Sequence, residues 1–268
     1  MKDLFQISHN RDEYVDPIEF HSHDFYEIYF FTDGNVTYYI ENESYNLKRG
    51  DVLIIPPGKL HRPVIENSIP YERYVLWLFG KFVDKQTELK SMLNHIDELV
   101  VLKGTRLFSF QGDKYEYLKT LFNKLSDKYS HGCEDAYYVC GSCVALIVNE
   151  LLEALNTAPA NQAENGDLIA EVISYINKNL QNAPSLDELS EHFFVSKYYL
   201  AHKFKEYAKT SVHKYILMKK INYAKQLLWQ GKSPCEVCRE CGFSTYSNFY
   251  KEFTKHTGKS PKEYRVNS

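Results

Sequence analysis

Three histidines and one glutamate near the start of the chain have the residue types and spacing of a metal site. They form the run His21-x-His23-x3-Glu27, and His61 follows after a Pro56-Pro57-Gly58 turn. On one strand, residues 21, 23 and 27 would share a face because side chains alternate along a strand. A neighbouring strand that ends at the turn would return His61 to the same place. Imidazoles with one carboxylate are suited to Zn, Ni, Mn or Fe.

The same polar groups are also suited to a small organic effector. Their hydrogen-bonding atoms could hold a sugar or another polar molecule against aromatic walls such as Tyr26, Tyr29, Tyr38 and Trp77. A third reading is purely structural, with His21 and Glu27 simply paired. The candidate effector-binding residues are His21, His23, Glu27, His61, Tyr29 and Tyr38.

The elements that position these residues are short strands followed by helices. Residues 20–77 are rich in aromatic and β-branched side chains, with turn signals such as Asp33-Gly34 between the runs, which is typical of a sandwich or barrel. Apolar residues then recur at helical spacing. We predict a barrel over 1–112, a helical hairpin over 113–157, a linker over 158–166 and a helical domain over 167–268. The hairpin is expected to mediate dimerisation, with packing on the barrel as the alternative.

The helical half repeats itself. Ser185 and Glu188 correspond to Ser233 and Glu236, and each pair has the spacing of a capping box at the start of a short helix. A tight turn and a second helix follow in each copy, which is the pattern of a helix-turn-helix. The segment 211–230 has no helix breaker and would hold the two copies apart. Recognition helices roughly 34 Å apart would enter successive major grooves of DNA.

Charge supports nucleic-acid binding by this half alone. From Gly166 onward the chain has 16 Lys and Arg against 10 Asp and Glu, whereas the residues before it have 16 against 25. An acidic half joined to a basic half indicates that only the second contacts DNA. The candidate DNA-facing residues of the two second helices, mostly donors and planar groups, are Lys197, Tyr198, Tyr199, Ala201, His202, Lys203 and Lys205, then Thr245, Tyr246, Ser247, Tyr250 and Lys251.

The last hundred residues resemble the AraC/XylS family of bacterial transcription regulators. The resemblance is carried by Lys220-x3-Ala224-x2-Leu227-Leu228, Gly242-Phe243, Phe249, Phe253, Gly258, Pro261 and Tyr264-Arg265. It implies a bipartite DNA reader of seven helices, with base contacts from Tyr198, Tyr199, Ala201, His202, Tyr246, Ser247, Tyr250 and Lys251. Lys203, Lys205 and Arg265 would contact phosphate or belong to the scaffold. Lys209, Pro234 and Cys238 depart from the usual family residues.

The first half resembles the two cupin motifs, in His21-x-His23-x3-Glu27-x6-Gly34 and Gly50-x5-Pro56-x-Gly58-x2-His61. Regulators of this family often begin with such a barrel as the effector sensor, and they usually activate transcription by recruiting RNA polymerase. The expected fold class is therefore α+β and multidomain: a cupin-like β-barrel with two helices, then an all-α domain with two helix-turn-helix motifs. The alternatives to a non-enzymatic, effector-responsive activator are a metal-dependent cupin enzyme with a DNA-binding appendage and an effector-independent repressor.

Location and redox state follow from what the sequence lacks. No apolar run approaches the 18 residues of a membrane span, and the start has no basic-then-apolar signal, so we expect a cytoplasmic protein. The six cysteines are then expected to be reduced. Cys235, Cys238 and Cys241 lie where a short helix needs small core residues, and we expect core packing there, with a redox or metal role as the alternative.

Overall fold

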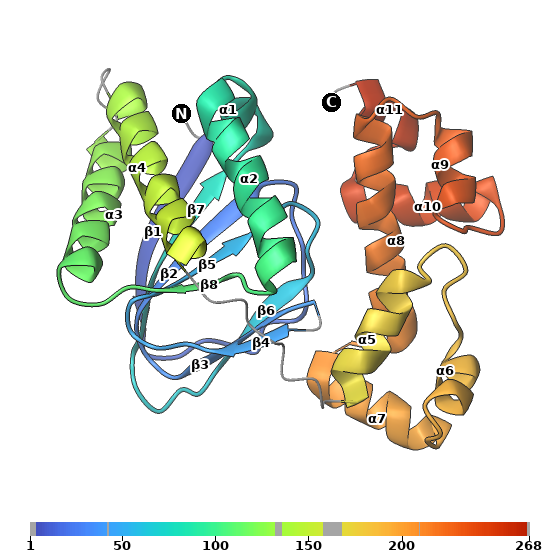
Figure 1. Ribbon diagram of the computed structural model, residues 1–268. Coiled ribbons are helices and arrows are strands. Elements are labelled where there is room, and N and C mark those ends of the chain that lie inside the picture. The colour runs from blue at the N-terminus through green and yellow to red at the C-terminus, as the bar shows by residue number, and fades with distance from the viewer. Residues whose placement is uncertain (1–3, 42, 132–135, 158–167, 209, 267–268) are drawn as a thin grey trace. The chain divides into compact units, whose positions relative to one another are not determined.

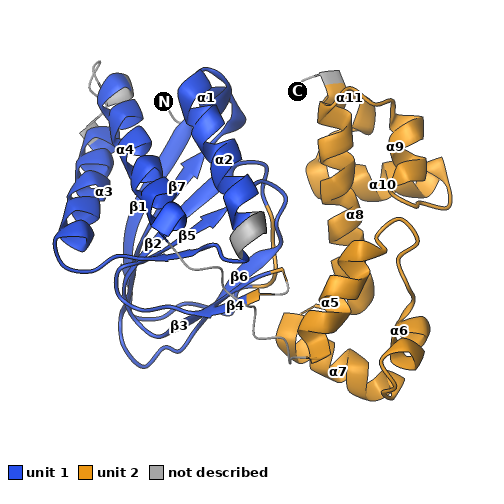
Figure 2. Ribbon diagram, in the orientation of Figure 1, with its two compact units in different colours: residues 1–18, 23–40, 44–164 blue, residues 19–22, 41–43, 165–268 orange. Residues whose placement is uncertain are grey.

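The computed structural model describes residues 4–41, 43–131, 136–157, 168–208 and 210–266. The chain divides into two compact units, which Figure 2 distinguishes by colour. The first unit contains residues 1–18, 23–40 and 44–164, and the second contains residues 19–22, 41–43 and 165–268. The predicted linker, 158–166, lies outside the described residues.

The first unit has two antiparallel sheets. One has the strand order β1-β7-β2-β5-β8 and the other has the order β4-β3-β6. The strands are β1 (Phe5–Asp12), β2 (Tyr26–Asp33), β3 (Val36–Ile40), β4 (Glu43–Asn46), β5 (Asp51–Ile55), β6 (His61–Ile65), β7 (Tyr71–Leu78) and β8 (Leu107–Ser109). The expected sheet-rich N-terminal domain is confirmed.

Both faces of the larger sheet are buried, and this gives the unit three layers. On β2, Ile28 and Phe30 belong to a core shared with helices. Tyr29 and Phe31 belong to a second core, together with Tyr38 of β3 from the other sheet. Because side chains alternate along a strand, β2 sends one set to each core. The side chains that face the second sheet, including Glu27, therefore lie in the interior of the sandwich.

Four helices cover the outer face of the larger sheet (Figure 1). They are α1 (Gly80–Asp84), α2 (Thr87–Lys103), α3 (Asp113–His131) and α4 (Ala136–Thr157). The division predicted between residues 112 and 113 is not a domain boundary, because α3 and α4 share their core with the strands. The sequence analysis also omitted α1 and α2. The helices at 113–131 and 136–157 are where the periodicity predicted them.

Helix α4 is long and apolar enough, by length and composition alone, to span a membrane. Residues Tyr138–Thr157 meet the length and hydropathy criteria of a membrane span, which no uninterrupted apolar run had indicated. Its apolar side chains are largely used inside the protein: Cys140, Val144, Ile147 and Leu151 are buried in the core with the sheet. These contacts are those of a core helix, which passes the same test.

The second unit is helical, as predicted. Its helices are α5 (Leu168–Lys178), α6 (Leu186–His192), α7 (Lys197–Ala208), α8 (Val212–Trp229), α9 (Pro234–Glu240), α10 (Tyr246–Thr257) and α11 (Pro261–Val266). Helices α6 and α7 form the first helix-turn-helix, and α9 and α10 form the second. Helix α8 is the predicted rod between them (Figure 1).

Serine caps begin the short helices of this unit. The Ser185 hydroxyl accepts from the Glu188 N–H, and the Glu188 carboxylate accepts from the Ser185 N–H at 2.7 Å. Ser233 and Glu236 repeat this reciprocal pair at α9. Ser260 and Glu263 form a third pair before α11, which the sequence analysis did not note. Each pair satisfies amide donors that have no partner inside the helix.

The second helix-turn-helix packs on α8 through one apolar cluster. Leu227 and Leu228 of α8 meet Val237 of α9 and Phe249 and Phe253 of α10. Among the cysteines, Cys238 and Cys241 lie in this cluster, as expected for core residues, whereas Cys235 is exposed. Cys140 and Cys143 are buried on α4, and Cys133 lies outside the described residues. The second unit also contains a buried ion pair, from Lys219 Nζ to the Glu41 carboxylate at 2.7 Å.

Candidate ligand site and candidate DNA interface

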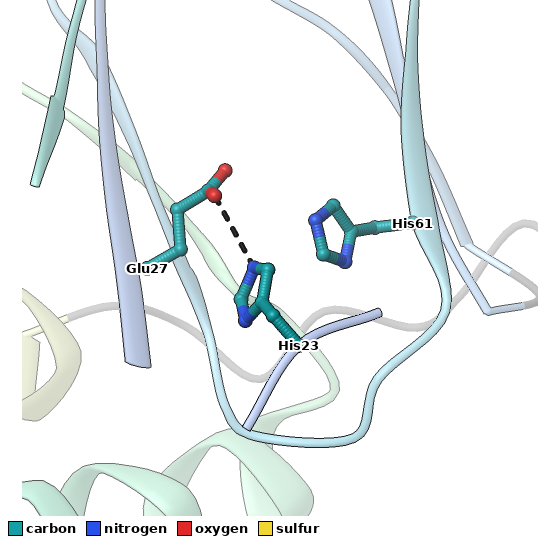
Figure 3. Close-up of side chains that lie close together, drawn as sticks. All are labelled: His23, Glu27 and His61. Carbon is teal, nitrogen blue, oxygen red and sulfur yellow. Dashed lines mark ion pairs between the residues drawn. The ribbon is translucent and has the colours of Figure 1, made fainter. Parts of the chain in front are cut away.

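Three of the four predicted metal-ligating residues come together in the first unit. His23, Glu27 and His61 place one ligand atom each within 4.8 Å of one another (Figure 3). Glu27 is the second residue of β2, His61 begins β6, and His23 lies in the segment just before β2. The rings of His23 and His61 meet edge to face, with their centroids 4.8 Å apart. Glu27 and His61 are buried.

Backbone carbonyls orient both imidazole rings in the same way. Nδ1 of His23 lies 2.9 Å from the Phe25 carbonyl oxygen, and Nδ1 of His61 lies 2.8 Å from the Lys59 carbonyl oxygen. A carbonyl oxygen only accepts, so Nδ1 carries the proton in each ring. Nε2 then holds a lone pair when the ring is neutral, and it carries a second proton, which His23 can donate to Glu27, when the ring is charged. A carbonyl partner on the far nitrogen is the usual support of a metal-binding histidine.

Glu27 is the anionic member of the cluster. Burial by itself raises the pKa of Glu27, but the hydrogen bond from His23, the charges of His61 and His23 and the hydrogen bond from Trp77 outweigh it and lower the pKa to about 2. Oε2 lies 3.2 Å from Nε2 of His23 and accepts from Trp77 Nε1 at 2.8 Å. Oε1 accepts from the Tyr38 hydroxyl at 3.1 Å. Trp77 faces Glu27 directly across β2 and β7.

His21 does not join the cluster, contrary to the prediction. Its side chain is exposed, and Nδ1 lies 3.1 Å from the carbonyl oxygen of Glu19. Residues 21 and 27 share a face only if one continuous strand runs between them. The strand begins only at Tyr26, so the face shared by alternate residues does not extend back to His21.

The two candidate tyrosines lie in the interior of the sandwich. Tyr38 bonds Glu27 directly. The ring of Tyr29 packs on the ring of Tyr38 with centroids 4.9 Å apart, and its hydroxyl shares a hydrogen bond with the Tyr71 hydroxyl. Tyr29 therefore contacts Tyr38, which in turn bonds Glu27. Trp77 was predicted only as an aromatic wall of the ligand pocket, whereas its indole N–H donates a hydrogen bond to the Glu27 carboxylate.

The donor set fits a divalent metal ion. Two imidazole Nε2 atoms and one carboxylate are three of the ligands that a zinc or iron site uses, with further positions left for water or ligand. Tetrahedral zinc with bonds of about 2.0–2.2 Å holds its ligands roughly 3.4 Å apart, so the three side chains must draw together slightly to bind it. The carbonyl bonds on both rings and the Trp77 bond to Glu27 already set their directions.

The second helices of the two helix-turn-helix motifs expose the residues predicted to face DNA. On α7, Lys197, Tyr198, Tyr199, His202 and Lys205 are exposed, and Ala201 is half-buried. On α10 and its cap, Thr245, Tyr246, Ser247, Tyr250 and Lys251 are exposed. The opposite faces hold the buried residues Leu200 and Phe204 on α7 and Phe249 and Phe253 on α10. Each helix therefore presents its polar and aromatic side outward.

Several of these side chains also have partners within the unit. Lys197 Nζ pairs with Asp187 at 2.7 Å, and Lys203 Nζ pairs with Glu206 at 3.0 Å. The Thr245 hydroxyl accepts from the Asn248 N–H and so caps α10. Asn248 itself is exposed in the first turn of α10, and the sequence analysis missed it. Asn248 lies two residues before Tyr250 and on the same helical turn as Ser247, and this position could have identified it as a candidate DNA-facing residue.

Two family models match the chain in this order. The model for an AraC-like ligand binding domain matches residues 9–107, and a helix-turn-helix domain model matches residues 189–267. The first match includes His23, Glu27 and His61. The second covers both candidate recognition helices.

Relatives named as transcription regulators align with most of the chain. The HTH-type transcriptional regulator YdiP of Escherichia coli is 25% identical over 247 residues, which cover 89% of this chain and 78% of that protein. YijO of the same organism is 28% identical over a region that covers 81% of this chain and 73% of that protein. The melibiose operon regulatory protein of E. coli is 21% identical and covers 87% and 78%. A crystal structure of ToxT from Vibrio cholerae is 14% identical, covers 98% of this chain and 95% of that one, and has a TM-score of 0.41. The domain matches and these relatives place the chain in the AraC family of transcription regulators.

Proposed function

We propose that the protein is an effector-responsive activator of bacterial promoters, which senses its ligand at His23, Glu27 and His61 and reads DNA with α7 and α10. The observation that carries this proposal is the outward polar and aromatic face repeated on both second helices. The direct test is selection of bound fragments from random DNA, followed by affinity measurements with and without candidate ligands. Recovery of no sequence at low ionic strength would remove the proposal.

Lys251→Ala is expected to weaken operator binding about tenfold, the size of one lost base or phosphate contact. Lys251 is exposed on α10, one residue after Tyr250. Lys178→Ala is the matched control, since it removes the same charge from an exposed site on α5, which is neither of the two recognition helices. Fluorescence anisotropy on the selected operator measures both. Equal affinity of wild type and Lys251→Ala would contradict the contact assigned to Lys251.

A divalent metal ion is the ligand that the donor set supports best. The two rings are held with Nε2 toward Glu27, and the carboxylate is anionic. A carbohydrate is the second candidate, because two relatives, from E. coli and Pediococcus pentosaceus, are named for the melibiose and raffinose operons. Thermal unfolding with separate metal and sugar panels distinguishes them, since only a ligand that binds the native state raises Tm.

Glu27→Gln is expected to lower the affinity for the metal about 100-fold or more, because it removes the anionic ligand while keeping the side-chain shape and acceptor oxygen. Glu72→Gln is the control. Glu72 also pairs with a histidine, His9 at 2.7 Å, but lies outside the three-ligand cluster. Calorimetric titration with Zn²⁺ and Mn²⁺ gives both affinities. Equal loss in the two variants would show that the metal does not bind at Glu27.

We propose that this cluster binds its ligand without turning it over, with a cupin enzyme as the alternative. The relatives support this, since they are named as transcription regulators. Product formation by the purified protein loaded with Fe²⁺ or Mn²⁺ would favour a cupin enzyme. Ligand-independent occupancy of the operator, with lower transcription, would favour a repressor instead.

We also propose that the protein acts as a cytoplasmic homodimer that recruits RNA polymerase. The part of α4 left exposed supports self-association: Tyr138 is 74% exposed and Leu146 is 44% exposed. Large apolar side chains on a helix surface are common at such contacts. Light scattering of the purified protein measures the dimer, and a Tyr138→Glu variant tests this face of the helix.

A further inference from the structure

Phe194 combines an unfavourable backbone with an exposed apolar side chain. It lies in the turn between α6 and α7, has a φ of 54° and is 95% exposed. Side chains with a Cβ are strained in this left-handed region, which glycine adopts freely. Burial does not offset the strain, because the ring is almost wholly in solvent.

The second helix-turn-helix shows what this turn ordinarily requires. The corresponding residue is Gly242, with a φ of 66°. The hydrogen bonds of the two turns match: the Val195 N–H donates to the Ser190 carbonyl, and the Phe243 N–H donates to the Cys238 carbonyl, both at 3.0 Å. This left-handed ending is usual at a helix C-terminus, and glycine is its usual residue. The first copy therefore keeps a phenylalanine where folding favours glycine.

The position of Phe194 in the motif indicates what the ring contacts. It precedes Lys197, the first residue of α7, by three positions, and Tyr198 on the next turn is 89% exposed. In a helix-turn-helix the N-terminal residues of the second helix approach the bases. The turn before that helix therefore lies at the edge of the groove. Residues that fold against local preference are most often found at functional sites.

We propose that Phe194 is a DNA-contacting residue, whose ring packs against apolar surface of the duplex at the edge of the first half-site. Deoxyribose and the thymine methyl group supply that surface. The contact adds affinity without charge and so complements the lysines of both recognition helices. This inference rests on DNA binding by the second unit.

Phe194→Gly in the full chain tests it, because this variant separates folding from binding. Glycine relieves the strained φ without a new clash, so the variant is expected to keep or raise its Tm while its operator affinity falls about five- to tenfold. The dependence of affinity on salt should keep its slope, because no phosphate charge contact is lost. Lys251→Ala, a charged variant, provides the comparison for that slope.

A base substitution identifies the apolar partner. Replacing thymine by deoxyuridine at each position of the first half-site removes one methyl group at a time. If one substitution lowers the operator affinity of wild type but not that of Phe194→Gly, the ring contacts that methyl group. If every substitution affects wild type and Phe194→Gly equally, the ring contacts deoxyribose.

The two proposals fail in distinguishable ways. A wild-type protein that binds no duplex removes DNA reading altogether. A wild type that binds and a Phe194→Gly variant that binds equally well overturn the contact alone. Unchanged DNA affinity with lost transcription also overturns it and assigns the ring to a protein partner.

Discussion

Gly242→Ala is expected to destabilise the second unit by about 2–4 kcal/mol, the cost of a strained left-handed residue added to a backbone clash. A Cβ at Gly242 would lie 1.7 Å from the carbonyl oxygen of Gln181, which is backbone and cannot rotate away. Lys220 Nζ also binds the Gly242 carbonyl oxygen at 2.7 Å, so the turn is held from a second side. Urea unfolding followed by circular dichroism measures the loss.

Gly258→Ala is the control for the backbone strain alone. Gly258 ends α10 with a φ of 71°, and a Cβ there would meet nothing within 4 Å. Its expected loss is about 1 kcal/mol, the ordinary cost of alanine in this conformation. Equal losses at the two glycines would show that the contact with Gln181 does not form in solution.

Insertion of five base pairs between the two half-sites is expected to lower operator affinity about 100-fold or more, to that of a single half-site. Half a helical turn moves the second groove to the opposite side of the duplex. Helix α8 spans 18 residues, or about 27 Å at 1.5 Å per residue, and side chains near both ends are buried, such as Val212 and Leu228. The two recognition helices therefore cannot both reach their grooves on this operator.

Insertion of ten base pairs tests whether the second unit is rigid or flexible. It restores the direction of the second groove but moves it away by a further 34 Å or so. Helix α8 is packed on the second motif through contacts such as that of Leu227 with Phe253. If α8 is rigid, the affinity for this operator is as low as for the operator with five inserted base pairs. Recovered affinity with ten base pairs would show that the two motifs move independently. Electrophoretic mobility shifts on the three operators measure the series.

Local signals were sufficient for the second unit. A serine with a glutamate three residues later defines a capped helix within one turn, and the caps at Ser185 and Ser233 formed as predicted. The rod and the exposed faces of α7 and α10 followed from helical periodicity in the same way. Each of these features depends on residues that are close in sequence.

The ligand site was predicted less completely because it depends on distant pairing. Where β2 begins is decided by its partners, since Tyr26 pairs with Leu78 and Glu27 with Ile55. Residues near His21 carry no signal for that boundary. Trp77 faces Glu27 through the register of β2 with β7, and this register cannot be predicted from the sequence because the two residues are 50 positions apart.

Other omissions had signals that were available in the sequence. Helix α2 places Leu89, Leu93, Ile96 and Val100 at helical spacing, and all four are buried. The repeat also aligned Phe194 with Gly242, which was enough to mark the first turn as strained. The boundary expected after residue 112 was wrong because the helical periodicity of α3 and α4 does not say which surface they cover.

The hydrogen bond from Trp77 to Glu27 gives the protein an optical reporter at its candidate ligand site. The chain contains two tryptophans, and the second, Trp229, is the last residue of α8 and is 50% exposed. An indole whose N–H donates to a carboxylate changes its emission when that carboxylate is neutralised. With Trp229 replaced by phenylalanine, a single tryptophan would report occupancy of the candidate ligand site, without a label and without DNA.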